Sequence, residues 1–280
     1  MSPTLAVMTE PVEEYAEAPL PAALRPFVAS MVGYRLAGFP PGVHVGMPSR
    51  HLTVILALDS GIRVSGNGIG NEPRRFGALL GGLHTSPAHV HHDGTQFGVQ
   101  LALTPLGSRA LLRAPAAAFA SGLVEMDDAL GGVGDRLREL LALSDGWPRR
   151  FDLLSRELLA LIDDRRSVDA PTAAAWAMLA GSRGRMPVAA VAEAVGWSRR
   201  HLTTRFAREF GPTPKLAGRV LRFEHSRELL GRIPLADIAI RCGYADQSHL
   251  VRDWREFAGA SPTQWLRDDA LARVGDTPAA

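Results

Sequence analysis

The sequence predicts an α+β protein of two domains. A β-rich sandwich or barrel with appended helices precedes an all-α domain, in which a long helix joins two helix-turn-helix units. Three observations predict this fold class. Short apolar runs separated by Gly and Pro fill the first hundred residues, helical periodicity begins near Gly107, and one helical motif occurs twice in the last hundred residues. A length of 280 residues also suits two domains better than one.

The predicted strands precede residue 104. Residues 51–58 are apolar and β-branched and stop at an Asp-Ser-Gly turn, and residues 62–65 alternate and stop at Gly-Asn-Gly. Residues 96–103 alternate in part. Short strands bounded by Gly-rich turns are typical of a small β-sandwich or barrel.

Helical spacing replaces this pattern after Gly107. It predicts helices over Ser108–Leu112, Asp135–Leu143 and Arg150–Ile162, and a charged run near residue 165 then separates two regions. We therefore expect a flexible tail over 1–22, the β-rich domain over 23–165, a linker over 166–170, the all-α domain over 171–270 and a second flexible tail over 271–280.

Composition limits the classes of function. Cys242 is the only cysteine, so neither an intrachain disulfide nor a zinc site of several cysteines can form. No signal peptide and no run of about 18 apolar residues is present, which predicts a cytoplasmic protein with no membrane partner. Residues 171–270 hold 15 Lys and Arg against 10 Asp and Glu, a net charge of +5 in a chain of net charge +2. A basic C-terminal domain favours nucleic acid as its partner.

The internal repeat is the most specific feature. Each copy has an apolar helical stripe, a Gly followed by an aromatic residue, a polar helix, and a second Gly shortly before a Pro. The turn glycines, Gly196 and Gly243, are 47 residues apart, and the terminal glycines, Gly211 and Gly259, are 48 apart. This order of elements, present twice, predicts two helix-turn-helix units.

Each part of the motif has a structural role. The turn glycines stand where the backbone needs a positive φ, and Trp197 and Tyr244 are expected to fill the core just after them. The apolar stripes that bury the first helix of each copy are Val188, Val191, Ala192 and Val195, and Leu235, Ile238, Ala239 and Cys242.

The second helix of each copy keeps a polar outer face. It is either a solvated surface of a helical array without a ligand or a surface that reads DNA. We favour DNA, because Arg pairs with guanine edges, Gln with adenine, and Ser or Thr with bases or phosphates. The candidate DNA-binding residues are Ser198, Arg199, Arg200, Thr203, Thr204, Arg205, Asp246, Gln247, Ser248, His249 and Arg252.

A long helix is predicted between the copies, over Pro214–Leu230. Its length of about 24 Å, at 1.5 Å per residue, would hold two recognition helices about one DNA turn apart. Such a spacing, roughly 34 Å, lets both helices enter successive major grooves on one face of the duplex.

These residues resemble the DNA-binding domain of the AraC/XylS family of bacterial transcription regulators over Pro171–Arg267. The motifs that carry the resemblance are Val195–Leu202, Arg205–Phe206, Gly211–Lys215, Arg222–Glu224, Leu235–Ala239, Gly243–Leu250 and Ser261–Pro262. The resemblance implies seven helices, an asymmetric double-stranded DNA site, and RNA polymerase as a partner if the protein activates transcription. It also implies recognition helices at Ser198–Phe210 and about Asp246–Phe257. Phe223, Ser226 and Trp265 depart from the family's usual residues at packing positions.

The N-terminal half resembles the cupin-like sensory domains of such regulators, on Pro48–Leu52 and Gly81–Thr85. The resemblance implies a domain that senses an unknown small-molecule effector or forms a homodimer. Two alternatives stay open. One is a domain that only dimerises, and the other is a metal-dependent cupin enzyme fused to the DNA-binding module.

The enzyme alternative rests on histidines, which are His44, His51, His84, His89, His91 and His92. His89 and His91 have the spacing of two metal ligands on one strand face, but the expected glutamate does not follow them. We therefore expect a polar hairpin tip, and a regulator without catalytic residues, metal or cofactor.

Overall fold

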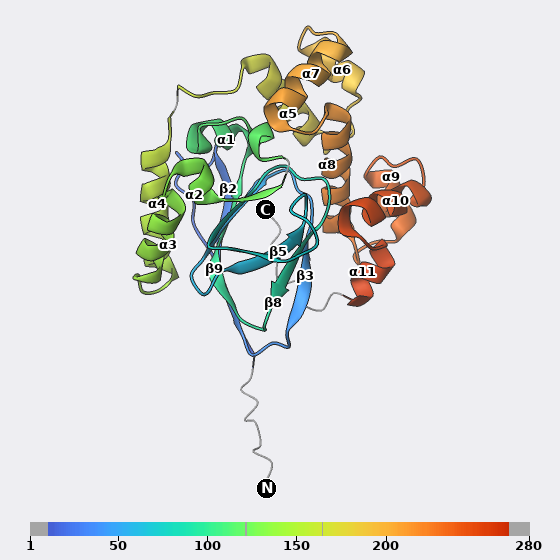
Figure 1. Cartoon of the computed structure of the whole chain (residues 1–280). Coiled ribbons are helices and arrows are strands. Elements are labelled where there is room, and N and C mark those ends of the chain that lie inside the picture. The colour runs from blue at the N-terminus through green and yellow to red at the C-terminus, as the bar shows by residue number, and fades with distance from the viewer. Residues whose placement is uncertain (1–10, 121, 164, 269–280) are drawn as a thin grey trace.

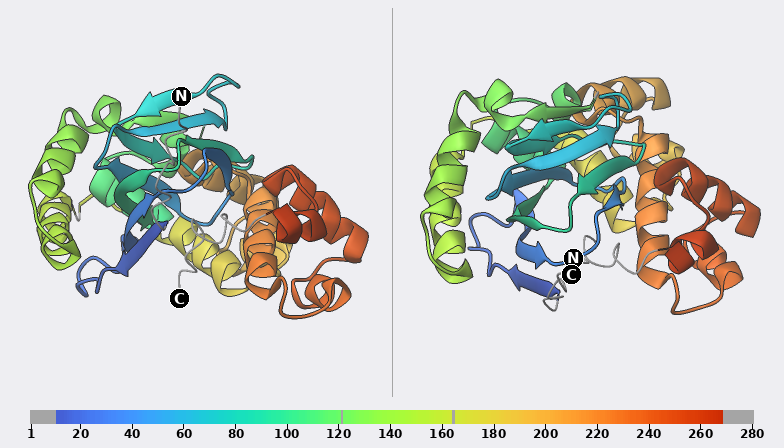
Figure 2. Two further views of the ribbon diagram at one scale, coloured as in Figure 1. Left: turned by 90° about the horizontal axis from the view of Figure 1, so that it is seen from below. Right: turned by 60° about the horizontal axis from the view of Figure 1, so that its bottom comes forward.

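The computed structural model describes residues 11–120, 122–163 and 165–268. A β-rich N-terminal part is followed by a helical C-terminal part, so the predicted α+β fold class is confirmed (Figure 1). In the two views of Figure 2 the sheets lie between one group of N-terminal helices and the helices of the C-terminal part. No helix among the described residues is long and apolar enough to cross a membrane.

Two antiparallel sheets form the β-rich part. The first has six strands in the order β1 (Val12–Glu17), β2 (Val28–Ala37), β9 (Gln96–Leu103), β4 (Leu52–Ala57), β7 (Ala78–Gly81) and β10 (Leu123–Glu125). The second has four strands in the order β3 (Gly42–Gly46), β8 (Ala88–His92), β5 (Ile62–Gly66) and β6 (Arg74–Phe76). The three strands expected from the sequence are confirmed as β4, β5 and β9.

Strand β1 corrects one expectation, because residues 12–17 fall in the segment predicted to be a flexible tail. They pair with β2 along their whole length, from Val12 opposite Ala37 to Glu17 opposite Val32. The indole Nε1 of Trp147 also donates a hydrogen bond of 2.8 Å to Glu14. Trp147 is 133 residues away in the sequence, so the pattern of residues 12–17 alone could not reveal this partner. Residues 1–10 and 271–280, also predicted to be tails, lie outside the described residues.

Helices cover one face of the six-stranded sheet. They are α1 (Pro105–Leu112), the 3-10 helix η1 (Ala116–Phe119), α2 (Met126–Leu130), α3 (Val133–Ala142) and α4 (Trp147–Leu161). Gly33 of β2 shows how closely α4 lies on the strands, since a Cβ there would come within 2.2 Å of the Trp147 ring. The helices predicted near Ser108, Asp135 and Arg150 are confirmed as α1, α3 and α4.

Residues 165–268 contain seven helices, the number that the family resemblance implies. They are α5 (Ala170–Gly181), α6 (Val188–Ala194), α7 (Arg199–Phe210), α8 (Pro214–Leu229), α9 (Leu235–Arg241), α10 (Gln247–Ala258) and α11 (Pro262–Asp268). Both turn glycines adopt the predicted positive φ, +72° at Gly196 and +75° at Gly243. Each unit is therefore a short helix, a glycine turn and a longer recognition helix.

The two units have different relations to the β-rich part. The core of the first unit, with Trp176, Phe206 and Phe210, is continuous with the hydrophobic cluster of the six-stranded sheet and its helices. Arg109 of α1 also donates two hydrogen bonds of 2.7 Å to the buried carboxylate of Glu209 in α7. The second unit has a separate cluster around Phe223, Trp254 and Phe257.

A buried hydrogen-bond chain organises this second cluster. The indole Nε1 of Trp254 donates to the Ser226 hydroxyl at 2.9 Å, and that hydroxyl donates to the Phe223 carbonyl at 2.6 Å. Ser226 and Trp254 are both fully buried. Ser226, one of the departures from the family's usual residues, therefore gives the buried indole its acceptor.

We predict that Ser226→Ala destabilises the protein by about 1–3 kcal/mol, because it leaves the Trp254 N–H buried without an acceptor. Urea denaturation followed by tryptophan fluorescence measures the change. Ser248→Ala is the matched control, since Ser248 is exposed and its loss should change stability by less than about 0.5 kcal/mol. Equal effects of the two substitutions would contradict this role for Ser226.

Candidate nucleic-acid interface

Recognition helix α7 begins at a side-chain cap and turns its apolar residues inward. The Ser198 hydroxyl accepts a hydrogen bond from the backbone N–H of His201 at 3.2 Å, which fixes where the helix starts. Leu202 and Phe206 are fully buried four residues apart. The opposite face of α7 is therefore left to polar side chains.

Arginines and threonines make up this face. Arg199 and Arg200 are exposed and form no ion pair with the described residues. The Thr203 and Thr204 hydroxyls donate to the carbonyls of Arg199 and Arg200, at 2.8 and 3.1 Å. Their oxygens can still accept from another group. Arg205 forms an ion pair of 3.0 Å with Asp169 at the start of α5, so part of its charge is used within the protein.

Recognition helix α10 repeats this arrangement. An Asp246 carboxylate oxygen accepts from the backbone N–H of His249 at 2.7 Å and caps the helix. Leu250 and Trp254 are fully buried. Among the candidate DNA-binding residues of this unit, Gln247, Ser248 and Arg252 are exposed. Two of the candidate DNA-binding residues, Ser198 and Asp246, are therefore the N-terminal caps of their helices.

Asp253 is not part of the outer face of α10, because it points inward. It is almost fully buried and pairs with Arg219 of α8 at 2.8 Å. Arg219 also pairs with Glu256 and lies over the Phe257 ring at 4.9 Å. The hydrogen bond that Arg219 donates to Glu256 is the main cause that raises the pKa of its guanidinium, against the opposing effect of burial. The bond that it donates to Asp253 raises the pKa further.

Two histidines occupy equivalent places in the two units. His201 packs edge-on against Trp197 at 4.7 Å between ring centroids, and His249 packs in the same way against Tyr244 at 5.2 Å. Each histidine follows its cap residue by three positions. Only His249 was among the residues selected from the sequence. Aligning the two copies on their caps, Ser198 and Asp246, was the signal that could have found His201.

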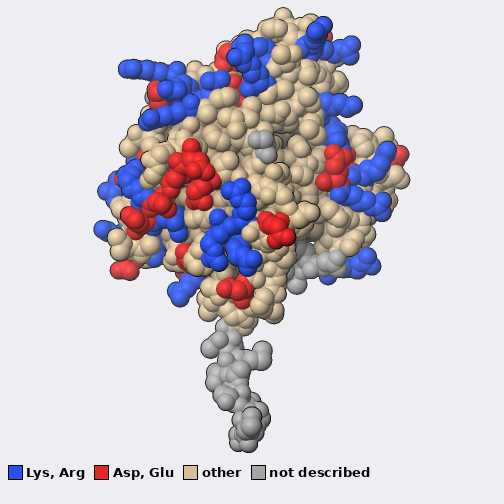
Figure 3. All heavy atoms as spheres, in the orientation of Figure 1, with Lys and Arg blue, Asp and Glu red and all other residues tan. Residues whose placement is uncertain are grey.

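Basic side chains gather over both units. Figure 3 shows Lys and Arg at the end of the molecule that carries α6 and α7, and again over α9 and α10. Helix α8 lies between the two groups (Figure 1). This distribution agrees with the net positive charge expected for residues 171–270.

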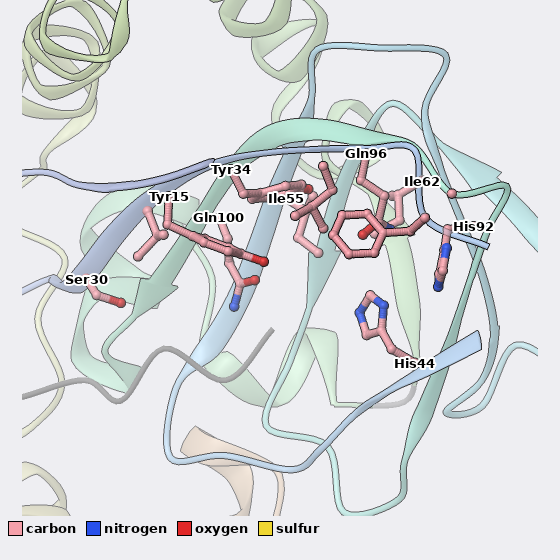
Figure 4. A pocket seen from close by; sticks show the side chains of 13 residues that line it. Tyr15, Ser30, Tyr34, His44, Ile55, Ile62, His92, Gln96 and Gln100 are labelled. Atoms are coloured by element: carbon pink, nitrogen blue, oxygen red, sulfur yellow. The ribbon is translucent and has the colours of Figure 1, made fainter. Parts of the chain in front are cut away.

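A cavity lies between the two sheets of the β-rich part, away from this surface (Figure 4). It contains about 870 Å³ of space between atoms, including the solvent at its mouth. His44 of β3 and His92 of β8 lie along one side of it, with their ring centroids 6.1 Å apart.

The other histidines do not join these two. His91 is hydrogen-bonded to the Ser65 hydroxyl at 2.8 Å. Burial lowers the pKa of His84 to about 4, and burial together with the charge of Arg50 lowers the pKa of His51 to about 4. Across residues 11–120, 122–163 and 165–268, no three His, Cys, Asp or Glu side chains are grouped so that they could hold a metal ion.

Comparison with known proteins finds a matching family model and similar solved structures. Residues 175–268 match the family model described as a helix-turn-helix domain. The solved structure of ToxT from Vibrio cholerae is similar with a TM-score of 0.50 and 12% sequence identity, over 85% of this chain and 97% of that chain. No curated protein matches the sequence.

Two further structures are similar over a smaller share of the chain. The C-terminal domain of AraT, a response regulator from Geobacillus stearothermophilus, has 23% identity and a TM-score of 0.35, over 40% of this chain and 95% of that chain. The DNA-binding domain of AdpA, a global transcriptional factor solved in complex with a target DNA, has 25% identity and a TM-score of 0.34. That match covers 39% of this chain and all of the AdpA domain.

The fold and the two capped recognition helices define a double helix-turn-helix protein with an added β-rich part. Residues 175–268 are an AraC-type helix-turn-helix domain, which confirms the resemblance seen in the sequence. DNA-binding transcription regulation is the function that this domain implies. The likeness to ToxT extends the shared fold over the cupin-like part as well.

We predict that Asp246→Ala destabilises the protein by about 0.5–2 kcal/mol, because α10 loses its N-terminal cap. Asp246→Asn keeps an oxygen that accepts from the His249 N–H, so it should cost clearly less. Urea denaturation of both full-length variants measures the difference. If the two substitutions cost the same, the charge of Asp246, and not its capping bond, contributes the stability.

Proposed function

We propose that this protein is a sequence-specific transcription regulator that inserts α7 and α10 into two successive major-groove segments. The observation that carries the proposal is the same placement of the two helices. Each begins at a side-chain cap, buries one face and exposes a polar face that includes arginine. With 16 residues, the helix α8 that joins the units is about 24 Å long at 1.5 Å per residue.

In this proposal the candidate residues divide by role. Ser198 and Asp246 position their helices. Arg200, Thr203 and Thr204 read bases in the first segment, and Arg199 and Arg205 bind phosphates nearby. In the second segment the bases are read by Gln247, Ser248, His249 and Arg252. Exposed guanidinium, amide and hydroxyl groups support these roles, because they match the hydrogen-bonding edges of bases.

We further propose that residues 23–165 act as a sensory domain, joined by a linker at 166–170 to the DNA-binding domain at 171–270. A small-molecule effector in the cavity between the sheets would control DNA binding, and two copies of the chain could associate through the sensory domain. In the described residues the histidines near the cavity are not grouped like metal ligands. A sensory role therefore explains the cavity better than a role as the active site of a metal-dependent enzyme.

Selection of bound oligonucleotides from a random double-stranded pool tests this function directly. We expect the full-length protein to enrich one asymmetric sequence with two conserved segments about one DNA turn apart. Recovery of a single short segment would mean that only one unit reads bases. Failure to enrich any sequence would refute the proposal.

Arg200 should contribute to specificity, and Phe206 to stability. We predict that Arg200→Ala lowers affinity for the selected sequence by about 1–3 kcal/mol more than affinity for random DNA, with little change in Tm. Phe206→Ala should instead cost about 3–5 kcal/mol of stability, because it removes a buried ring. Fluorescence anisotropy and thermal denaturation measure the two quantities. If Arg200→Ala weakens both kinds of binding equally, Arg200 is a phosphate contact.

Salt dependence checks the electrostatic part of binding. Because Lys and Arg that contact phosphates release counterions, we predict that the logarithm of the association constant falls linearly with the logarithm of salt concentration. Each lost phosphate contact should reduce the slope by about 1. The slope is measured by anisotropy titrations of the wild-type protein and the Arg199→Ala variant between low and moderate salt. A flat profile would contradict a major-groove interface with several Arg contacts.

A further inference from the structure

The cavity between the sheets is lined by residues that alternate along its strands. On β2, Val32 and Tyr34 face the cavity, whereas Gly33 lies against Trp147 of the covering helix α4. His44 of β3 and His92 of β8 face them from the other sheet (Figure 4). About 870 Å³ of space between atoms, open solvent at the mouth included, lies among these residues.

The lining of the cavity indicates the charge of its ligand. None of the residues that line it is Lys, Arg, Asp or Glu. A buried charge without a partner is strongly disfavoured, and a carboxylate, phosphate or ammonium group would meet no Lys, Arg, Asp or Glu in this lining. Aliphatic and aromatic side chains form most of the wall. Its hydrogen-bonding groups belong to Tyr15, Ser30, Tyr34, Gln96, Gln100 and the two histidines. Burial lowers the pKa of His92, against the opposing charge of Asp93, and so favours the neutral form of its imidazole.

Strand β3 links this cavity to the second helix-turn-helix unit. Among the described strands it lies at the edge of its sheet and pairs with β8 alone. One face of β3 carries His44 into the cavity. The other face carries Val45, which packs against the hydrophobic cluster of the second unit, and the cluster includes the buried Met47 just beyond the strand.

An ion pair strengthens the same connection. Arg50, three residues after Met47, donates from its side chain to Glu224 of α8 at 2.5 Å, and its backbone N–H donates to the same carboxylate at 3.4 Å. Glu224 is 174 residues away in the sequence and lies within the helix that joins the two units. The segment from His44 to Arg50 therefore touches the cavity at one end and the DNA-binding helices at the other.

We propose that the cavity binds an uncharged, largely apolar molecule with one or two hydrogen-bonding groups, and that the segment 44–50 transmits its occupancy to the second helix-turn-helix unit. This inference rests on the proposed function as a DNA-binding regulator. A molecule that contacts His44 moves an edge strand with a single neighbour. Because Val45, Met47 and Arg50 are attached to the second unit, the movement changes the placement of α10 relative to α7.

The ligand class is tested with two probes that differ in charge. Nile red, an uncharged dye, reports occupancy of the cavity in the full-length protein by its fluorescence. We expect 4-propylphenol to displace it, and 4-propylbenzoate to need at least about tenfold higher concentration. Gln100→Trp, which fills the cavity, should abolish dye binding, whereas Arg63→Trp, on the exposed face of β5, should not. The ligand assignment is wrong if 4-propylbenzoate displaces the dye as well as 4-propylphenol or better. It is also wrong if the Gln100→Trp variant still binds the dye.

Transmission is tested by a double-mutant comparison on the selected DNA. We expect Gln100→Trp or saturating 4-propylphenol to change the Kd for that DNA at least about fivefold, the lower end of usual coupling between two sites. In the double variant Met47→Ala/Arg50→Gln the same treatments should change the Kd for the selected DNA less than twofold. Circular dichroism confirms that each variant is folded, and the ligand treatment replaces Gln100→Trp if that variant does not fold.

The outcomes separate this inference from the proposed function. If the protein selects a DNA sequence but the treatments leave its Kd unchanged, or change it equally in both backgrounds, transmission through 44–50 is wrong and the proposed function stands. If no sequence is selected, the proposed function fails. In that case hydrogen exchange of α9 and α10 is measured with and without 4-propylphenol. Transmission through 44–50 predicts that the ligand changes the protection of these helices in the wild type but not in Met47→Ala/Arg50→Gln. Any other result contradicts the inference.

Discussion

The packing of α8 on three sides is the constraint on which the arrangement of the helical part depends. Leu221 belongs to the cluster shared by the first unit and the β-rich part, and Phe223 belongs to the core of the second unit. Glu224 pairs with Arg50. The backbone approach is also close, since a Cβ on Gly184 would come 2.1 Å from the carbonyl oxygen of Gly218. Dense packing of this kind resists rotation of α8 about its axis, so the relative orientation of the two recognition helices depends on the contacts of α8.

This constraint explains why the outer faces of α7 and α10 are free for other contacts. The cores are filled on this side by Leu202, Phe206, Leu250 and Trp254, and each cap accepts a hydrogen bond from one of the first backbone N–H groups of its helix. The one acidic residue in the middle of α10, Asp253, is turned inward and neutralised by Arg219. Stability and DNA contact thus depend on different side chains of the same helix, so each can be altered with little effect on the other.

Features encoded over short stretches could be predicted from the sequence. The two helix-turn-helix units follow from apolar spacing, the turn glycines and the cap at Ser198, all within about one repeat. Strand β1 and the segment 44–50 could not be predicted, because they are stabilised by partners far along the chain. Glu14 accepts from Trp147, 133 residues away, and Arg50 meets Glu224, 174 residues away. His201 was missed for a different reason, since its role is visible only when the two copies are compared.

Thermodynamic linkage places one more requirement on a regulator built in this way. A ligand shifts the equilibrium between two arrangements of β3 only by the difference between its binding free energies for those arrangements. The same difference must appear in reverse, so DNA that fixes α10 changes the affinity of the cavity by the same factor. The ion pair of Arg50 is partly exposed and therefore sensitive to salt, whereas the Met47 contact is apolar and buried. Coupling through 44–50 should then weaken with salt only in the part that Arg50 contributes, and Met47 should maintain the remainder.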